Sequence, residues 1–507
     1  MALSERHFQN ERLRLMDVFL QGASDALTLS SILSVIGGIF LGYMVGVLPG
    51  LSRPAALSVA VPLTYAMSPI GAIAFLVGVT KASAAGGATG AILLNTPGEP
   101  SSAATTFDGY PLARKGQATR ALKTALYASV FGDLVATFTL ILLASSLARF
   151  ALKMGPVEMT AVMIFALSFI AALSGDSLSR GIISGVLGLF LATIGLDPES
   201  ATPRMTFGHI ELFDGIPLIA ATVGMLAFTE MLIQVQTLFA NRENNTEPEG
   251  IALETDKEIR FEDVKRTFPV TLRATGIGIA AGIIPGLGPT IGAFLSYAIN
   301  KRLAKPDDCY GEGDLKGVAA TEAADNAVLP ASLIPLFAIG LPGSVSAAIL
   351  VSAFMLHGVQ PGPLVFEQHP RLIYGIYVSM IVASLVMLVV GRLGLTIFAR
   401  ITQVPARFII PFVVLFCVVG TYLERDTVFS VFAMLALGVL GYVMQRFGYS
   451  VVTFLIGFVI GPLFELSLRQ ALIVTNHSPV EVFQHPIAVG FLIASMAALL
   501  LFLRSER

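Results

Sequence analysis

The sequence predicts an all-α polytopic membrane protein with roughly 12 or more transmembrane segments at the usual span length. Charged residues make up 13% of its 507 residues and hydrophobic residues 55%, whereas globular chains carry about 25% charged residues. Residues 26–52, 274–300 and 326–356 contain no Asp, Glu, Lys or Arg, and a membrane helix needs only about 20 such residues. The apolar runs have helical length and do not show the alternation that marks an outer-membrane barrel.

Composition along the chain divides it into four parts. Residues 1–28 are polar and suit an interfacial helix over their second half, and no short apolar core follows them as in a cleaved signal peptide. Residues 29–240 form a first membrane repeat. Residues 241–267 hold eight acidic and five basic residues and are expected to be a soluble linker. Residues 268–504 form a second repeat of similar length, which favours an internal duplication.

The expected helices are the long apolar runs of the two repeats. In the first repeat these runs are 30–48, a broken segment 50–66, 70–94, 118–150, 156–173, 179–196 and 216–238. In the second repeat they are 268–284, a broken segment 287–303, 317–339, 344–358, 372–399, 406–422, 427–446, 450–464 and 486–504.

Two Pro-Gly breaks recur in the same order in each repeat. The first repeat has Pro49-Gly50 and then Pro97-Gly98, and the second has Pro285-Gly286 and then Pro342-Gly343. Proline removes a backbone donor and glycine loosens the chain, so each pair is expected to interrupt a helix. Unpaired backbone groups are tolerated in a bilayer only where protein or a polar cavity satisfies them. Matched breaks in two halves therefore point to a transporter binding site, and the alternative is that they only kink the helices.

The basic residues predict how the two repeats are related. In the first repeat a cluster over 114–123 follows the second break, whereas in the second repeat a cluster over 301–305 follows the first break. Positive residues favour the cytoplasmic side. Opposite placement relative to matching motifs predicts inverted repeats with broken helices or re-entrant hairpins.

Helix starts and small polar residues at the breaks are suited to bind a carboxylate. A helix that begins after a break points unpaired N–H groups and the positive end of its dipole at the break, and Ser, Thr and Asn side chains add hydrogen bonds. The alternative role for these polar residues is to cap helices and turns. The candidate substrate-binding residues are Pro49, Gly50, Ser52, Lys81, Asn95, Thr96, Pro97, Gly98, Ser101, Ser102, Gly286, Gly288, Thr290, Pro342, Gly343, Ser344 and Ser346.

Charged residues inside apolar runs are the remaining candidates, because charge in a membrane is costly. Lys81 is expected to be a counter-ion for an acidic substrate, or else to snorkel or to pair with Glu99 or an acidic residue of another helix. Glu322 and Asp325 share a helix face. With Asn326 they are candidates for binding Na+ or H+, and a salt bridge or a solvated loop is the alternative.

The remaining features are expected to be structural or exclude classes of function. Glu465 and Arg469 lie four residues apart in the favourable order and are expected to form a structural ion pair. The sequence shows no hydrolase triad, metal-ligand cluster or phosphate-cradling loop, so we expect neither an enzyme nor a bound cofactor. The net charge of −2 carries no nucleic-acid signature, and Cys309 and Cys417 are expected to be free thiols.

Motifs across nearly the whole chain resemble the large integral membrane (permease) subunit of the tripartite tricarboxylate transporter family. The matching stretches are 46–52, 91–98, 108–113, 194–198, 204–208, 282–288, 333–335, 340–344 and 461–465. The family commonly has a Tyr- and Gly-rich stretch where this chain has 80–87, and Pro-Glu before Ala-Asn-Asn-Ala where it has 321–327. Both departures add or move charge near the candidate site.

The resemblance implies a secondary transporter of the bacterial inner membrane that imports citrate-like and other organic carboxylates by symport, without an ATPase. It also implies two partners, a small four-helix membrane subunit and a periplasmic solute-binding protein. Alternatives to active transport are a passive channel and a scaffold subunit that only docks a partner.

Overall fold

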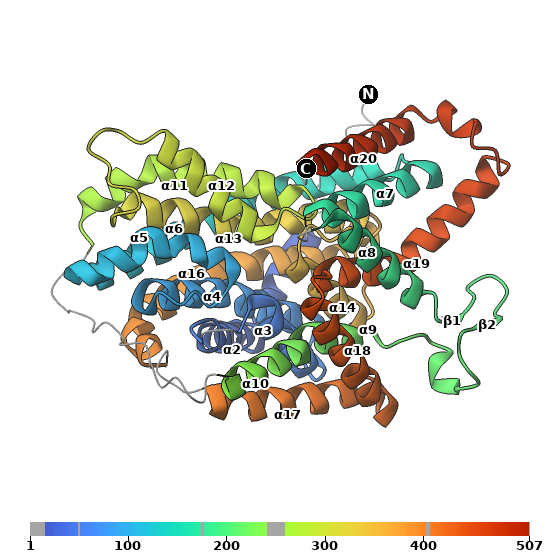
Figure 1. Ribbon diagram of the computed structural model, residues 1–507, viewed down its shortest axis with the longest axis horizontal. Coiled ribbons are helices and arrows are strands. Elements are labelled where there is room, and N and C mark those ends of the chain that lie inside the picture. Colours follow the sequence, from blue (N-terminus) through green and yellow to red (C-terminus); the bar gives the residue numbers. More distant parts are fainter. Residues whose placement is uncertain (1–15, 49–50, 174–176, 241–258, 402–405, 506–507) are drawn as a thin grey trace.

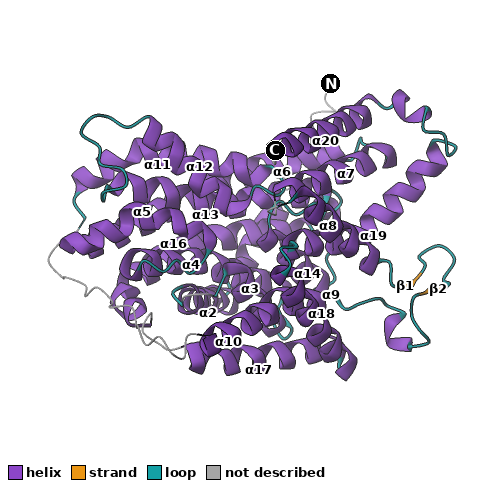
Figure 2. Ribbon diagram, in the orientation of Figure 1, coloured by secondary structure: helices purple, strands orange, loops and turns teal. Residues whose placement is uncertain are grey.

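The computed structural model describes residues 16–48, 51–173, 177–240, 259–401 and 406–505 (Figure 1). Helices make up most of this part of the chain, and the strands within it are β1 (Gly195–Leu196) and its antiparallel partner β2 (Pro203–Arg204) (Figure 2). The expected all-α class is confirmed. Pro49, Gly50 and most of the expected linker lie outside the described residues.

Residues 16–26, within the N-terminal segment, are helical. The first repeat follows with a series of longer helices. These are α2 (Leu29–Gly46), α3 (Arg53–Ala60), α4 (Pro69–Leu94), α5 (Ala103–Leu112), α6 (Ala118–Ala151), α7 (Pro156–Leu173), α8 (Leu178–Ala192), α9 (Leu218–Thr222), the π-helical turn η5 (Val223–Phe228) and α10 (Thr229–Ala240).

The second repeat has the same order of a first helix, a break, a long buried helix and a second break. Its helices are α11 (Phe261–Ile283), α12 (Gly288–Arg302), α13 (Leu315–Ile339), α14 (Val345–Leu356), α15 (Val365–Gln368), α16 (Pro370–Ile401), α17 (Ala406–Arg425), α18 (Val428–Arg446), α19 (Val451–Val474) and α20 (Pro486–Ser505).

The structure differs from the expected elements in three places. Helix α5 was not expected, because Gly109 and Pro111 lie within it. Helix α11 begins at Phe261, inside the segment expected to be a soluble linker, and Arg260 and Asp263 form a capping box at its start. Helix α19 continues through Pro462 to Val474, beyond its expected end.

The lengths and compositions of the helices indicate which of them can span a membrane. In the described part of the chain, eight helices are long and apolar enough to cross a membrane, and four shorter apolar helices accompany them. The polytopic architecture is thus confirmed, although a number near the expected count is reached only when the shorter helices are included.

Glycines bring the first helix of each repeat close to the long buried helix of the same repeat. A Cβ atom on Gly42 of α2 would lie 2.3 Å from the carbonyl oxygen of Val79 in α4, and one on Gly278 of α11 would lie 2.3 Å from that of Ala324 in α13. Small residues allow this backbone approach in membrane helix pairs. The long helices cross over between repeats, since α6 packs on α13 and α16 packs on α4. The two repeats therefore interlock around α4 and α13; their inverted relation remains a prediction.

Candidate functional site: a polar pocket between the broken helices

In the first repeat, separate helices lie on either side of the first expected break, and the second break follows the end of α4. Helix α2 ends at Gly46, and α3 begins at Arg53, where the Ser52 side chain accepts a hydrogen bond from the Ala55 backbone N–H at 3.4 Å. Helix α4 ends at Asn95, which takes a left-handed conformation with φ 54° and allows the chain to turn away from the helix axis. The helical structure resumes at Pro100.

The second repeat repeats this arrangement. Helix α11 ends before Pro285, Gly286 has φ 93°, and α12 begins at Gly288 with proline in its first turn. Helix α13 ends at Gly340 with φ 78°. Helix α14 begins after Ser344, whose side chain accepts a hydrogen bond from the Ala347 N–H at 3.2 Å.

Within each repeat, the second break packs against the end of the helix that precedes the first break. A Cβ atom on Gly98 would lie 2.4 Å from the carbonyl oxygen of Gly46, and one on Gly343 would lie 2.7 Å from that of Gly282. In the second repeat the Gly286 N–H also donates to the Gly343 carbonyl at 3.2 Å. The structure therefore brings the two Pro-Gly motifs of the second repeat together, and in the first repeat it brings Gly98 to the end of α2.

A cavity of about 470 Å³ lies where the breaks of the two repeats meet. Such a volume is within the usual range for small-molecule sites. Six of the expected substrate-binding residues line this cavity; they are Ser52, Gly286, Gly288, Thr290, Ser344 and Ser346. Arg53, Glu99, Pro100, Glu230 and Gln445 contribute to the same wall.

The other candidates at the breaks lie outside the cavity lining. These are Asn95, Thr96, Pro97, Gly98, Ser101 and Ser102 in the first repeat, and Pro342 and Gly343 in the second. The hydroxyl groups of Thr96 and Ser102 are buried and make no hydrogen bond within the described structure. These residues shape the breaks and do not form the cavity surface.

Arg53 is the main cation of the site and was not among the expected residues. Its side chain is 2% exposed. Its Nη2 atom lies 3.0 Å from Oε1 of Glu99 and 2.7 Å from Oδ2 of Asp325. A sequence signal existed, because Arg53 interrupts an apolar stretch directly after a Pro-Gly break, but nothing local indicated its partners.

The expected ion-binding residues lie next to this ion pair on α13. Oε1 of Glu322 accepts a hydrogen bond from Thr105 at 2.6 Å, and Oε2 accepts one from Ser129 at 3.2 Å. The Asn326 amide donates to the Ser129 hydroxyl at 2.8 Å. Of these three residues, Asp325 forms a salt bridge, and its partner is Arg53. A salt bridge was the stated alternative to ion binding.

Lys81 does not line the cavity, which corrects its expected role as a substrate counter-ion. It is 2% exposed, and its Nζ atom lies 2.5 Å from Oδ2 of Asp133 on α6. Nζ also donates to the Met380 carbonyl at 2.7 Å and to the Ser384 hydroxyl at 2.8 Å, both on α16. A charge buried among three helices needs such partners, and pairing with an acidic residue of another helix was one of the stated alternatives.

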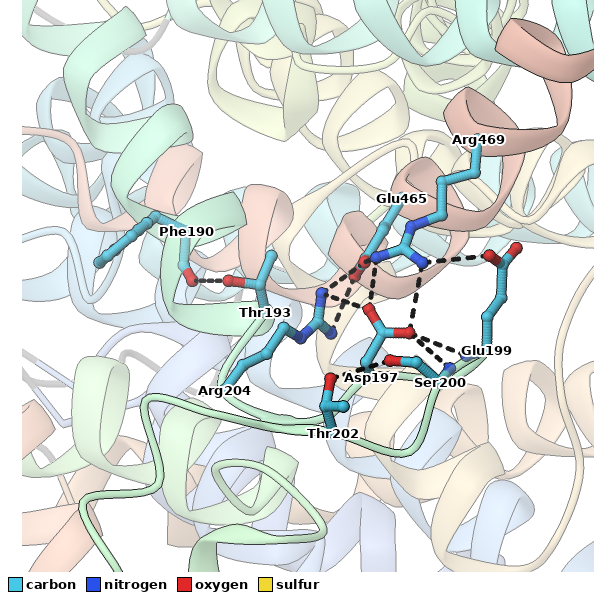
Figure 3. Close-up of polar contacts among 9 residues, drawn as sticks. All are labelled: Phe190, Thr193, Asp197, Glu199, Ser200, Thr202, Arg204, Glu465 and Arg469. Atoms are coloured by element: carbon cyan, nitrogen blue, oxygen red, sulfur yellow. Dashed lines mark hydrogen bonds and ion pairs between the residues drawn. The ribbon is translucent and has the colours of Figure 1, made fainter.

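A second ionic cluster lies at the β1–β2 hairpin and does not contribute to the cavity (Figure 3). Arg469 of α19 pairs with Asp197 at 2.6 Å and with Glu465 at 2.7 Å, and Arg204 pairs with Glu465 at 2.6 Å. The expected Glu465–Arg469 ion pair is thus confirmed. The hydrogen bond from Arg469 holds the pKa of the Asp197 carboxyl well below its ordinary value. The cluster fastens the hairpin to α19.

Comparison with known proteins agrees with this architecture. The model of the tripartite tricarboxylate transporter TctA family matches residues 32–456. A protein of Agrobacterium vitis, described as an uncharacterized 52.8 kDa protein in the TAR-I ttuC' 3' region, is 35% identical over 491 residues, which cover 96% of each chain. A second A. vitis protein, from the TAR-II ttuC' 3' region, is 35% identical over 234 residues, covering 45% of this chain and 97% of its own length.

No solved structure matches the chain. The matched region of the family model includes all four Pro-Gly motifs, and the match to the first relative covers nearly the whole chain. The chain therefore belongs to the tripartite tricarboxylate transporter TctA family, whose members are large, multi-pass membrane subunits.

Proposed function

We propose that this protein is the permease subunit of a binding-protein-dependent secondary transporter that imports organic carboxylates by symport with Na+ or H+. The observation that carries the proposal is the cavity of about 470 Å³ that both repeats line at their helix breaks. Interrupted helices in corresponding positions of two halves are the arrangement in which transporters bind substrates and coupling ions.

Three helix starts at the cavity support an anionic substrate. Helix α3 starts after Ser52, α12 starts at Gly288, and α14 starts after Ser344, and all three of these residues line the cavity. Each helix start carries unpaired N–H groups and partial positive charge, which favour a carboxylate. The hydroxyl groups of Thr290 and Ser346 add hydrogen-bond donors to the same wall.

The buried carboxylates next to the cavity support cation coupling. Glu99, Glu322 and Asp325 are all buried, and an anion entering alone would add charge to a medium of low dielectric constant at prohibitive cost. We therefore propose that Na+ or H+ enters with the substrate, with Glu322, Asp325 and Asn326 in the ion-binding region.

The tripartite organisation of the family supports the proposed assembly. In it, a small four-helix membrane subunit accompanies this chain in the bacterial inner membrane, and a periplasmic solute-binding protein delivers the carboxylate. Ions provide the driving force, and no enzymatic step is proposed.

Uptake by reconstituted vesicles tests the proposal. Vesicles containing this chain and its two partner components would be given labelled citrate or succinate, with an imposed Na+ gradient, an imposed pH gradient or neither. We expect accumulation under at least one gradient and none without. Uptake that equilibrates regardless of either gradient would indicate a passive channel, and assembly without any uptake would indicate a scaffold.

A further inference from the structure

We propose that Arg53 binds the substrate carboxylate by exchanging partners. In the substrate-free protein its guanidinium group is held by Glu99 and Asp325, and monovalent cations release it to the cavity by taking its place at these carboxylates. This inference rests on the proposed function and adds a named residue and a coupling step to it.

The position of Arg53 allows this exchange. Arg53 is the first residue of α3, directly after the N-cap Ser52, and both residues line the cavity together with Glu99. Its Nε and Nη2 atoms donate to Oε1 of Glu99 at 3.3 and 3.0 Å. Nη2 also donates to both oxygens of Asp325, at 3.0 and 2.7 Å. A guanidinium group has five N–H donors in a rigid plane and pairs well with a second carboxylate.

The charges around Arg53 do not balance. Glu322 lies one helical turn before Asp325 on α13, and its carboxylate is bound by the hydroxyl groups of Thr105 and Ser129. Among the described residues, Arg53 forms ion pairs with Glu99 and Asp325, whereas the side-chain hydrogen bonds that Glu322 accepts come from hydroxyl groups. The one guanidinium group therefore pairs with two of the three buried carboxylates.

The ion pairs among the described residues bring no second cation to Glu99, Asp325 or Glu322. Helices α4 and α6 contribute the Lys81–Asp133 pair, which is neutral as a unit. Helix α2 contributes the buried hydroxyl of Tyr43, which makes no hydrogen bond in the described structure, and Glu230 lines the cavity from α10. Uncompensated charge in such surroundings is costly, so the carboxylates are suited to take up protons or Na+.

This imbalance makes cation binding a condition for substrate binding. If Arg53 turned to a substrate carboxylate while Glu99 and Asp325 stayed ionised, both would be left buried and unpaired, which is strongly unfavourable. A proton or a Na+ ion at each carboxylate removes that cost, so Arg53 becomes available once cations have bound. Because the incoming carboxylate is then neutralised by Arg53, substrate and cation favour each other's binding.

The test uses Glu99→Gln and Arg53→Gln in the full complex with both partner components. Binding of labelled citrate and succinate is measured over a range of Na+ concentrations and, separately, of pH. We expect wild-type affinity to rise with Na+ or with acidity, and the responsive series identifies the cation. The neutral amide of Glu99→Gln mimics one of the two occupied carboxylates, so its affinity at low cation concentration should exceed that of the wild type. Its dependence on the cation should be weaker, because only Asp325 still needs a cation before Arg53 is released.

Arg53→Gln should weaken substrate binding by about 30-fold or more at every cation concentration, as expected when a buried charged partner is removed. Arg53→Lys should restore part of the affinity. Arg120→Gln is the matched control, because Arg120 pairs with Asp263 away from the cavity, and it should bind as the wild type does. If Arg53→Gln does not assemble, Glu99→Gln still tests the exchange, since it retains the Arg53–Asp325 pair.

Different results would contradict the proposed transport function and the partner exchange of Arg53. Wild-type complex that neither binds nor transports citrate or succinate under any gradient contradicts the proposed function and the exchange with it. Gradient-driven transport by the wild type, with full cation dependence in Glu99→Gln or unchanged affinity in Arg53→Gln, overturns the exchange alone.

Discussion

At the scale of single residues, two buried cations have different environments. Lys81 is enclosed by α4, α6 and α16 and paired with Asp133, whereas Arg53 lines the cavity with its acidic partners. The sequence placed Lys81 inside an apolar run, because long uncharged stretches flank it. It did not indicate the partner, because the pair joins residues 52 positions apart, and the Arg53–Asp325 pair spans 272 positions. Such pairs are decided by tertiary packing.

Removing Lys81 tests its structural role. Lys81→Met should destabilise the protein by about 3–5 kcal/mol, because it leaves the Asp133 carboxylate buried without a cation. Lys81→Met combined with Asp133→Leu should recover most of that stability, and the substrate KM of the double variant should stay at the wild-type value. Thermal unfolding in detergent and uptake kinetics measure the two quantities. A stable Lys81→Met variant with a much increased KM would show that Lys81 meets the substrate after all.

At the scale of elements, the breaks were predictable and some of the helices were not. Proline and glycine disfavour helical backbone at their own positions, so both breaks of each repeat could be predicted from the sequence alone. Helix α5 was missed for the same reason, since Pro111 and Gly109 stand inside it and only packing against α4 and α13 keeps it helical. The local effects of proline and glycine thus predict where a helix is interrupted. They do not predict a helix such as α5, which contains both residues and remains helical.

Equivalent glycines at the second breaks should respond alike to substitution. Gly98→Ala and Gly343→Ala each place a Cβ atom too close to a backbone carbonyl, at 2.4 and 2.7 Å, and overpacking of this kind costs about 1–3 kcal/mol. Thermal unfolding would be compared with Gly276→Ala on α11, where a Cβ meets nothing within 4 Å. That control should be neutral or slightly stabilising because alanine favours helix. Wild-type stability in both break variants would contradict the close packing.

The β1–β2 hairpin should detach from α19 in acid. The hydrogen bond from Arg469 lowers the pKa of Asp197, so its carboxylate stabilises the folded hairpin above the ordinary pKa of about 3.9. This stabilisation is lost progressively as the pH falls below that value towards the lowered pKa. Limited proteolysis within 195–217 should increase over that range.

Asp197→Asn should be cleaved readily at neutral pH as well, because it lacks the charge that Arg469 binds. Equal protection of the wild type and this variant at every pH would show that the ionic cluster does not hold the hairpin.

At the scale of the whole molecule, the sequence predicted two repeats but not how they interlock. The order of helices and breaks could be seen in the spacing of Pro-Gly motifs. The packing of α6 on α13 and of α16 on α4 could not, because each contact joins helices of different repeats. This crossing holds α4 and α13 next to each other (Figure 1). Helix starts from both repeats then line one cavity.

Substrate protection of cysteines placed at the breaks tests the shared cavity most directly. In a Cys309→Ser, Cys417→Ser background, Ser52→Cys reports on the first repeat and Thr290→Cys on the second, because both positions line the cavity. Ile210→Cys, which is 73% exposed and lies outside the cavity, is the control.

The measurement is the rate of modification by a charged thiol reagent, with and without the transported carboxylate. At a substrate concentration of about ten times Kd, the account predicts that modification slows about tenfold at Ser52→Cys and at Thr290→Cys and stays unchanged at Ile210→Cys. Protection of only one repeat, or of neither, would contradict a substrate site built from the helix breaks of both.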